Sequence, residues 1–157
     1  MGVDPGLNKT GIGIVGWEKN KLHYAGHALL TTTTGRSLPE RLKVIIDGVA
    51  EEAGKYDLHS AAVENVFYSV NAKSALILGQ TRGAIIASLL MSNLSVFEYS
   101  ALQIKQSVVG YGKAEKEQVK KMVELHLNRK FDKLALDVTD ALACAVCLAL
   151  HQSSTVR

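Results

Sequence analysis

Two stretches decide the fold: M-G-V-D-P-G at residues 1–6 and T-G-I-G-I-V-G-W at residues 10–17. The first is typical of a strand that breaks into a Pro-Gly turn. In the second, apolar residues alternate with small ones, which is the period of a strand. Residues 21–31 continue as a third strand, with residues 18–20 as the hairpin turn. The chain is therefore expected to begin with three antiparallel strands.

Beyond these strands, helical and extended patterns alternate. Ser37 and Glu40 have capping-box spacing and precede a helical repeat that ends near Gly54. Residues 60–67 form a short apolar run typical of a buried parallel strand, and residues 94–99 form another short strand. This order predicts an α/β protein with a mixed five-stranded sheet, its first three strands antiparallel, and helices on both faces. Further helices are expected over residues 71–91, 101–107, 115–129 and 134–151.

Composition narrows the class of protein. With 157 residues, 47% of them hydrophobic and 21% charged, the chain is one globular domain rather than a disordered segment. We expect this domain to span residues 1–152, with a polar tail at residues 153–157. Cys144 and Cys147 cannot form a disulfide framework or complete a zinc site. No apolar run reaches the ~18 residues of a membrane span, and the N-terminus lacks a signal-peptide pattern, so a soluble, cytoplasmic protein is expected.

The positive charge is concentrated in one segment. The whole chain has a formal charge of +3, whereas residues 101–130 hold seven Lys or Arg against three Glu, a balance of +4. This clustering indicates a face that binds anions. A solvated helix surface rich in lysine is the alternative interpretation.

Four acidic residues stand apart from those on helix surfaces and in loops. Asp4 ends the first strand, and Glu64 interrupts the apolar strand A-A-V-E-N-V at residues 61–66. Asp137 and Asp140 are three positions apart at the start of the last helix, so they project from one face. A carboxylate in a central strand is costly unless a positive charge compensates it. Several converging carboxylates would repel one another unless divalent cations lie between them.

Such a cluster is what a two-metal phosphodiester nuclease requires. Mg²⁺ and Mn²⁺ prefer oxygen ligands from a few carboxylates, waters and phosphate oxygens. Two such ions about 4 Å apart activate the attacking water and stabilise the leaving oxyanion. Each residue also has a structural interpretation, for example Asp4 as a turn residue before Pro5 and Asp137 as a helix N-cap. Together, the four residues favour the metal site.

A family resemblance is carried by six blocks of sequence. They are G-V-D-P-G at 2–6, V-E-N-V-F at 63–67, N-A-K-S-A-L-I-L-G-Q-T-R-G at 71–83, V-F-E-Y at 96–99, I-K-Q-S-V-V-G-Y-G-K-A-E-K-E-Q-V at 104–119 and D-V-T-D-A-L-A at 137–143. In order along nearly the whole chain, they resemble the RuvC family of bacterial Holliday junction resolvases. The resemblance implies an RNase H-like fold, a homodimer, and symmetric nicking of four-way DNA junctions in recombination and repair. It also implies two Mg²⁺ ions per subunit, with Mn²⁺ able to substitute, and contact with the branch-migration proteins RuvA and RuvB.

The resemblance assigns residues as well. The family's catalytic, metal-binding carboxylates fall on Asp4, Glu64, Asp137 and Asp140. Phe67 matches an aromatic residue that stacks on or wedges against bases at an opened junction, with a core aromatic as the alternative interpretation. Only three residues precede Asp4, whereas the family normally has several, so either the first strand is short or the chain lacks its natural start.

Five lysines are expected to contact DNA. Lys105 and Lys116 match family lysines near the scissile phosphate and the DNA backbone, and Lys116 is also expected to assist catalysis. Lys113, Lys120 and Lys121 are expected to add phosphate contacts, which position the duplex without reading its sequence.

The helix expected over residues 71–91 is apolar on two sides. A surface helix needs only one apolar stripe, so the second indicates a dimer contact. A two-fold dimer also suits a four-way junction, which presents two equivalent strands for cutting. In this interpretation Leu76, Gly83, Ile86 and Leu90 face the sheet, and Leu78, Ile85 and Leu89 face the partner.

Other functions remain as alternatives. The opening D-P-G-L-N-K-T-G-I-G at residues 4–13 also resembles the first phosphate loop of actin-like and sugar-kinase ATPases, which share the RNase H-like core. Those phosphotransferases need two such domains and a second glycine-rich Asp-Gly motif, which this chain lacks. Another RNase H-like nuclease is the closer rival. A DNA-binding dimer without activity is disfavoured because all four carboxylates are retained.

Overall fold

A single mixed sheet forms the centre of the computed structural model, which describes residues 1–19, 21–65 and 71–155. The strand order is β3-β2-β1-β4-β5. β1 pairs antiparallel with β2, and β2 with β3, whereas the β1–β4 and β4–β5 pairs are parallel. The predicted mixed five-stranded sheet is therefore confirmed. The strands are β1 (Gly2–Asp4), β2 (Lys9–Glu18), β3 (Lys21–Thr31), β4 (Ser60–Asn65) and β5 (Ser95–Ser100).

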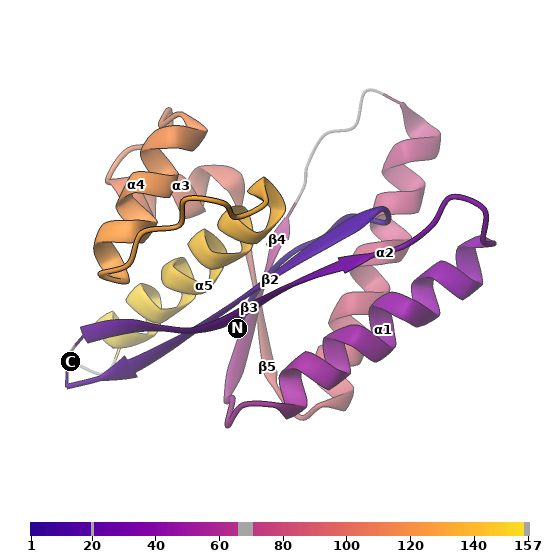
Figure 1. Cartoon of the computed structure of the whole chain (residues 1–157), viewed down its shortest axis with the longest axis horizontal. Helices are drawn as coiled ribbons and strands as arrows, with labels where there is room; N and C mark the ends of the chain where they lie inside the picture. Colours follow the sequence, from indigo (N-terminus) through magenta and orange to yellow (C-terminus); the bar gives the residue numbers. More distant parts are fainter. Residues whose placement is uncertain (20, 66–70, 156–157) are drawn as a thin grey trace.

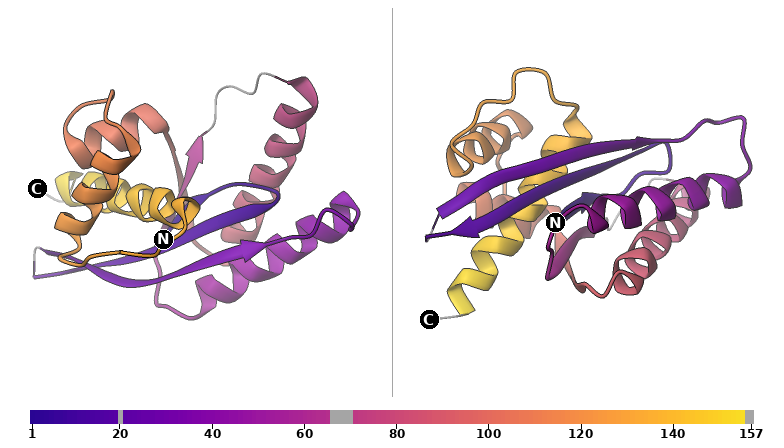
Figure 2. Two further views of the ribbon diagram at one scale, coloured as in Figure 1. Left: turned by 45° about the horizontal axis from the view of Figure 1, so that its top comes forward. Right: turned by 60° about the horizontal axis from the view of Figure 1, so that its bottom comes forward.

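Helices cover both faces of this sheet, as predicted. Figures 1 and 2 show α1 and α2 together on one side and α3, α4 and α5 on the other. The last helix continues to Thr155, so it includes part of the segment that was expected to be a polar tail. The helices are α1 (Leu38–Gly54), α2 (Ala72–Met91), α3 (Ala101–Val109), α4 (Lys116–His126) and α5 (Leu136–Thr155).

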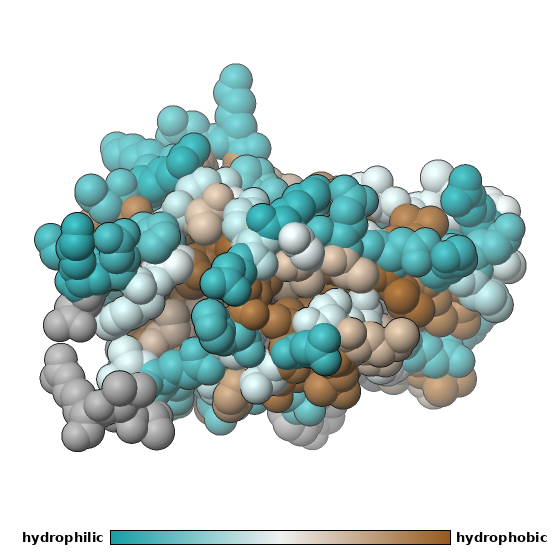
Figure 3. Space-filling view, turned by 90° about the horizontal axis from the view of Figure 1, so that it is seen from below, coloured by the Kyte–Doolittle hydropathy of each residue, from teal (hydrophilic) through white to brown (hydrophobic). Residues whose placement is uncertain are grey.

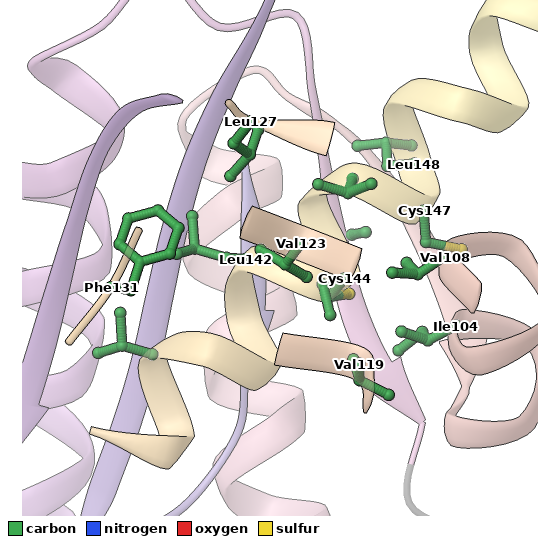
Figure 4. Close-up of a cluster of buried hydrophobic side chains, with 14 of the residues drawn as sticks. Ile104, Val108, Val119, Val123, Leu127, Phe131, Leu142, Cys144, Cys147 and Leu148 are labelled. Atoms are coloured by element: carbon green, nitrogen blue, oxygen red, sulfur yellow. The ribbon is translucent and has the colours of Figure 1, made fainter. Parts of the chain in front are cut away.

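Each face of the sheet has its own hydrophobic core. Figure 4 shows side chains from α3, α4 and α5 meeting over one face, with Cys144 and Cys147 fully buried among them. The two cysteines are thus core residues. On the other face, α1 and α2 contribute Ile45, Ile85 and Leu89 to a second cluster.

Glycines let α5 lie directly against the sheet. A Cβ atom at Gly11 of β2 would overlap the backbone carbonyl of Asp137, and one at Gly2 of β1 would overlap that of Ala141. Because only hydrogen atoms occupy these positions, the first turns of α5 approach the backbone of β1 and β2. This close approach brings Asp137 and Asp140 to the end of the sheet where β1 stops.

The orientation of α2 differs from the prediction. Ile85 and Leu89 are fully buried in the core, whereas Leu76 is 65% exposed and Leu90 is 56% exposed. The buried face of α2 also carries polar Thr81 and Ser88, and the Ser88 hydroxyl donates to the Ile46 carbonyl of α1 over 2.9 Å. The buried face of α2 therefore contains polar as well as apolar residues. Hydrophobicity along the sequence could therefore not tell the two sides apart.

By length and composition, α2 is also the one helix within the described residues that could cross a membrane. Its 18-residue window has a mean hydropathy of 1.4, although only 22% of that window is buried. The helix packs against α1, β4 and β5. A single helix of this kind is weak evidence for a membrane span.

A cavity of about 1010 Å³ lies at the end of β1 opposite Asp4. Its walls come from β2 at Val15–Trp17, from the residues around Ser60, and from the C-terminal half of α5. The Met1 ammonium group donates to the Ser60 carbonyl over 3.1 Å, and burial lowers the pKa of this amine to about 6. The walls of this cavity do not include Asp4, Glu64, Asp137 or Asp140.

Candidate active site

Asp4 lies at the C-terminal end of β1, where it pairs with Gly11 of β2. The loop that follows is fastened by side chains: the Thr10 hydroxyl donates to the Gly6 carbonyl over 2.8 Å, and the Thr32 hydroxyl to the Leu7 carbonyl over 2.6 Å. Arg41 Nε of α1 in turn donates to the Thr32 hydroxyl over 2.8 Å. These contacts hold the chain rigidly just after Asp4.

The other three acidic residues come to the same end of the sheet. The parallel register of Val3 with Val63 places Asp4 and Glu64 level on neighbouring strands. α5, lying over β1 and β2, contributes Asp137 and Asp140. All four side chains are half-buried.

Burial and neighbouring charges shift the pKa values of two of these carboxyl groups. Burial, followed by the charges of Glu64, Asp140 and Asp137, raises the pKa of Asp4 to about 8. Burial and the charge of Asp140 also raise the pKa of Glu64. The neighbouring carboxylates therefore make ionisation of Asp4 and of Glu64 less favourable, which is the repulsion that the sequence predicted.

Two lysines belong to this cluster. Lys116 Nζ, at the start of α4, lies 2.7 Å from Asp140 Oδ2, and this hydrogen bond raises the pKa of Lys116. The charge of Lys105, on α3, acts in the opposite sense to burial and lowers the pKa of Glu64. The two lysines that the sequence placed nearest the chemistry are thus beside the carboxylates.

Three further lysines of the basic segment were expected to contact DNA phosphates. Lys113 and Lys121 are exposed and Lys120 is half-buried, and none of the three forms an ion pair within residues 1–19, 21–65 and 71–155. Phe67 lies outside the described residues, so its predicted stacking role stays a prediction.

The oxygen donors fit a hard divalent cation. In the part of the chain that the structure describes, no three His, Cys, Asp or Glu side chains are already placed to hold one ion. Mg²⁺ does not need such a cage, because it usually takes one or two carboxylates together with waters and phosphate oxygens. A cluster in which burial and mutual repulsion disfavour ionisation is also one that an added cation would stabilise.

Sequence reasoning missed two features near this site. Gly11 and Gly13 were assigned only to a strand, although glycines at alternate positions are the signal of a close backbone approach. The role of Arg82 on α2 could also not be assigned from the sequence. In the structure, Arg82 pairs with Glu98 of β5 and so anchors α2 to its own sheet.

A mixed sheet with carboxylates at the shared end of β1 and β4, and on the helix that crosses them, defines an RNase H-like nuclease. The family model described as "Crossover junction endodeoxyribonuclease RuvC" matches residues 1–148. The chain therefore belongs to the RuvC family of endonucleases, as its sequence predicted. This membership decides against the phosphotransferase that the opening motif also resembled.

Individual relatives agree with this assignment. The crossover junction endodeoxyribonuclease RuvC of Ralstonia pickettii is 46% identical over 156 residues, which cover 99% of this chain and 85% of the relative. That of Methylobacillus flagellatus is 47% identical over 154 residues, or 95% of this chain and 85% of the relative. Among solved structures, Thermus thermophilus RuvC in complex with a Holliday junction substrate has a TM-score of 0.91 at 28% identity, covering 98% of this chain and 94% of that one.

Proposed function

We propose that this chain, as a homodimer, cuts four-way DNA junctions by Mg²⁺-dependent hydrolysis and makes paired, symmetric nicks. The observation that carries the proposal is the coupled acidic cluster, in which burial and three carboxylates raise the pKa of Asp4 to about 8. The Holliday junction bound by the Thermus relative supports the choice of substrate. Work in recombination and repair, a cytoplasmic location and partnership with RuvA and RuvB belong to the same proposal.

The four carboxylates would hold the metal ions. Two divalent ions in such a site supply an activated water and charge compensation at the leaving oxygen. Asp4 and Glu64 offer oxygens from neighbouring strands, while Asp137 and Asp140 offer theirs from α5. Mn²⁺ has the same preference for oxygen ligands and would substitute for Mg²⁺.

The lysines divide into two groups by their place. Lys116 and Lys105 lie beside the carboxylates, where a positive charge stabilises the negative charge that develops on the scissile phosphate. Lys113, Lys120 and Lys121 lie on α4 and in the loop before it, where they would contact DNA phosphates. Phe67, three residues after Glu64 in the sequence, is proposed to stack on a base.

The outer face of α2 is the proposed dimer contact. Ala75, Gly79, Gly83 and Ala87 are all exposed and follow one another at intervals of four, so they form one stripe of small residues. A Cβ at either glycine would meet nothing, which leaves room for a second helix to approach closely. Figure 3 shows apolar surface interspersed with polar residues across the centre and the α1–α2 half of the underside.

A cleavage assay tests the proposal. Purified protein is incubated with a synthetic four-way junction, or with linear duplex of the same sequence, in Mg²⁺ or in EDTA. We expect two symmetric nicks in the junction with Mg²⁺ only, and little cutting of the duplex. Equal cutting of both substrates would contradict the junction specificity, and cutting in EDTA would contradict the metal dependence.

A further inference from the structure

Lys116 occupies an unusual place for a lysine. It is the first residue of α4, and its Nζ lies 2.7 Å from Asp140 Oδ2. Its positive charge also acts on Asp4 and Glu64, the two carboxylates on the strands. The ammonium group is therefore paired with Asp140, and its charge lowers the pKa of Asp4 and of Glu64 as well.

The helix itself does not favour this residue. A helix N-terminus carries a partial positive charge, so an acidic residue stabilises the first turn and a lysine does not. Within the described residues, the lysines at 105, 113, 120 and 121 form no ion pair, whereas Lys116 does. The carboxylates across the gap, rather than the helix, thus hold the Lys116 ammonium in place.

The ion pair between Lys116 and Asp140 is also weak. The Lys116 side chain is 63% exposed, and an ion pair this open to water contributes little. A lysine has a flexible four-carbon stem and can redirect its ammonium group without moving the backbone. Asp140 is only 25% exposed, so the carboxylate stays where α5 puts it while the lysine can leave.

We propose that Lys116 is an exchangeable counter-ion of the acidic cluster: its ammonium pairs with Asp140 in the metal-free protein and would give way to a divalent cation held by the same carboxylates. The inference rests on the proposed metal site and adds an order of events to it. The lysine would compete with the cation for Asp140, and binding of the cation would free the ammonium more often for a DNA phosphate. Lys116 would then lower the affinity of the site for the metal and would link metal binding to DNA binding.

Metal affinity without DNA tests the competition. Mn²⁺ binding is measured by electron paramagnetic resonance for wild type, Lys116→Gln and Lys105→Gln. We expect Lys116→Gln to bind Mn²⁺ about fivefold more tightly than wild type, the size of an exposed ion pair. Lys105→Gln removes the same charge near Glu64 without a direct ion pair, so it should change affinity by less than about twofold.

The outcomes separate the two proposals. If wild type binds Mn²⁺ and Asp4→Asn does not, the metal site is present; an equal affinity of Lys116→Gln and Lys105→Gln would then overturn the competition alone. If folded wild type binds no Mn²⁺, the metal site itself fails, and the competition with it.

Nuclear magnetic resonance follows the lysine directly. In EDTA, a hydrogen-bonded ammonium signal is expected in ¹⁵N-labelled wild type and is absent from Lys116→Gln. Saturating Mg²⁺ should broaden or remove this signal, because the ammonium leaves Asp140 for water. A signal that persists unchanged at saturating Mg²⁺ would contradict the displacement.

Discussion

The ionised form of Asp4 is unfavourable in the folded protein. Its pKa is about 8 when folded, because of burial and neighbouring carboxylates, against an ordinary value of 3.8. Between these two pH values, the folded state keeps a proton that the unfolded state has lost. The free energy of unfolding of the metal-free protein should therefore fall as the pH rises through this range.

Thermal unfolding in EDTA, from about pH 5 to about pH 8.5, measures this effect. The Tm of wild type should fall as the pH rises, whereas Asp4→Asn, which is neutral and nearly the same size, should lose most of that dependence. Mg²⁺ at the upper end of the range should stabilise wild type more than the variant. Parallel curves for the two proteins would show that Asp4 is neither buried nor coupled as described.

Gly11 allows α5 to approach the sheet at the acidic cluster. Gly11→Ala would place a methyl group against the Asp137 carbonyl, so α5 must shift or the variant loses about 1–3 kcal/mol of stability. Cleavage should fall more than binding, because Asp137 and Asp140 move while the basic surface does not. Gly35→Ala, where a Cβ meets nothing, is the matched control for urea denaturation and cleavage. If both variants match wild type, the close approach is unimportant.

Among single residues, the acidic ones could be predicted because each one breaks a local pattern. Glu64 interrupts an apolar strand, and Asp4 stands where a strand would continue its core. The ion pair between Lys116 and Asp140 could not be predicted from spacing, because it depends on how α4 packs against α5. The sequence supplied the residue types, and the packing supplied their partners.

Among the elements, α2 shows the limit of hydrophobic periodicity. Both of its sides are apolar, and the buried one accepts Ser88 because Ile46 of α1 offers a carbonyl to its hydroxyl. That hydrogen bond is a tertiary contact, which no pattern within the helix reveals. The capping residues at Ser37 and Ser100, whose partners are three residues away, were by contrast predictable.

The corrected face of α2 gives a dimer prediction. Leu76→Glu should yield a folded monomer, because a charge on the outer face opposes helix–helix contact without touching the core. Leu125→Glu, a change of the same kind at a 71% exposed position on α4, is the control and should remain dimeric. Sedimentation equilibrium at micromolar concentration distinguishes them. A dimeric Leu76→Glu, or a monomeric wild type, would count against this interface.

The basic face of α4 gives a prediction about salt. Each phosphate contact that is lost should reduce the slope of log K against log salt by about 0.9. Lys120→Ala should therefore weaken junction binding for all sequences alike and lower the slope by that amount. Lys43→Ala, on α1 at the opposite face, should leave the slope unchanged. An unchanged slope for Lys120→Ala would remove this residue from the DNA surface.

For the whole molecule, the order of elements was enough to predict the architecture. A run of antiparallel strands followed by strand–helix alternation permits few topologies, and the observed order β3-β2-β1-β4-β5 is one of them. The same topology explains the site, since the parallel neighbours β1 and β4 end together and so bring Asp4 beside Glu64. The extension of α5 to Thr155 was missed because polar residues at a helix end give no apolar period.

The most direct measurement is single-turnover cleavage of a four-way junction at saturating enzyme, for wild type and for Asp4→Asn, Glu64→Gln, Asp137→Asn and Asp140→Asn. Each variant replaces a carboxyl group with an amide of nearly the same size. We predict that every variant cuts at least about a hundredfold more slowly in Mg²⁺ while it binds the junction nearly as tightly as wild type. A folded variant that cuts at close to the wild-type rate would contradict the claim that these four carboxylates form the catalytic centre.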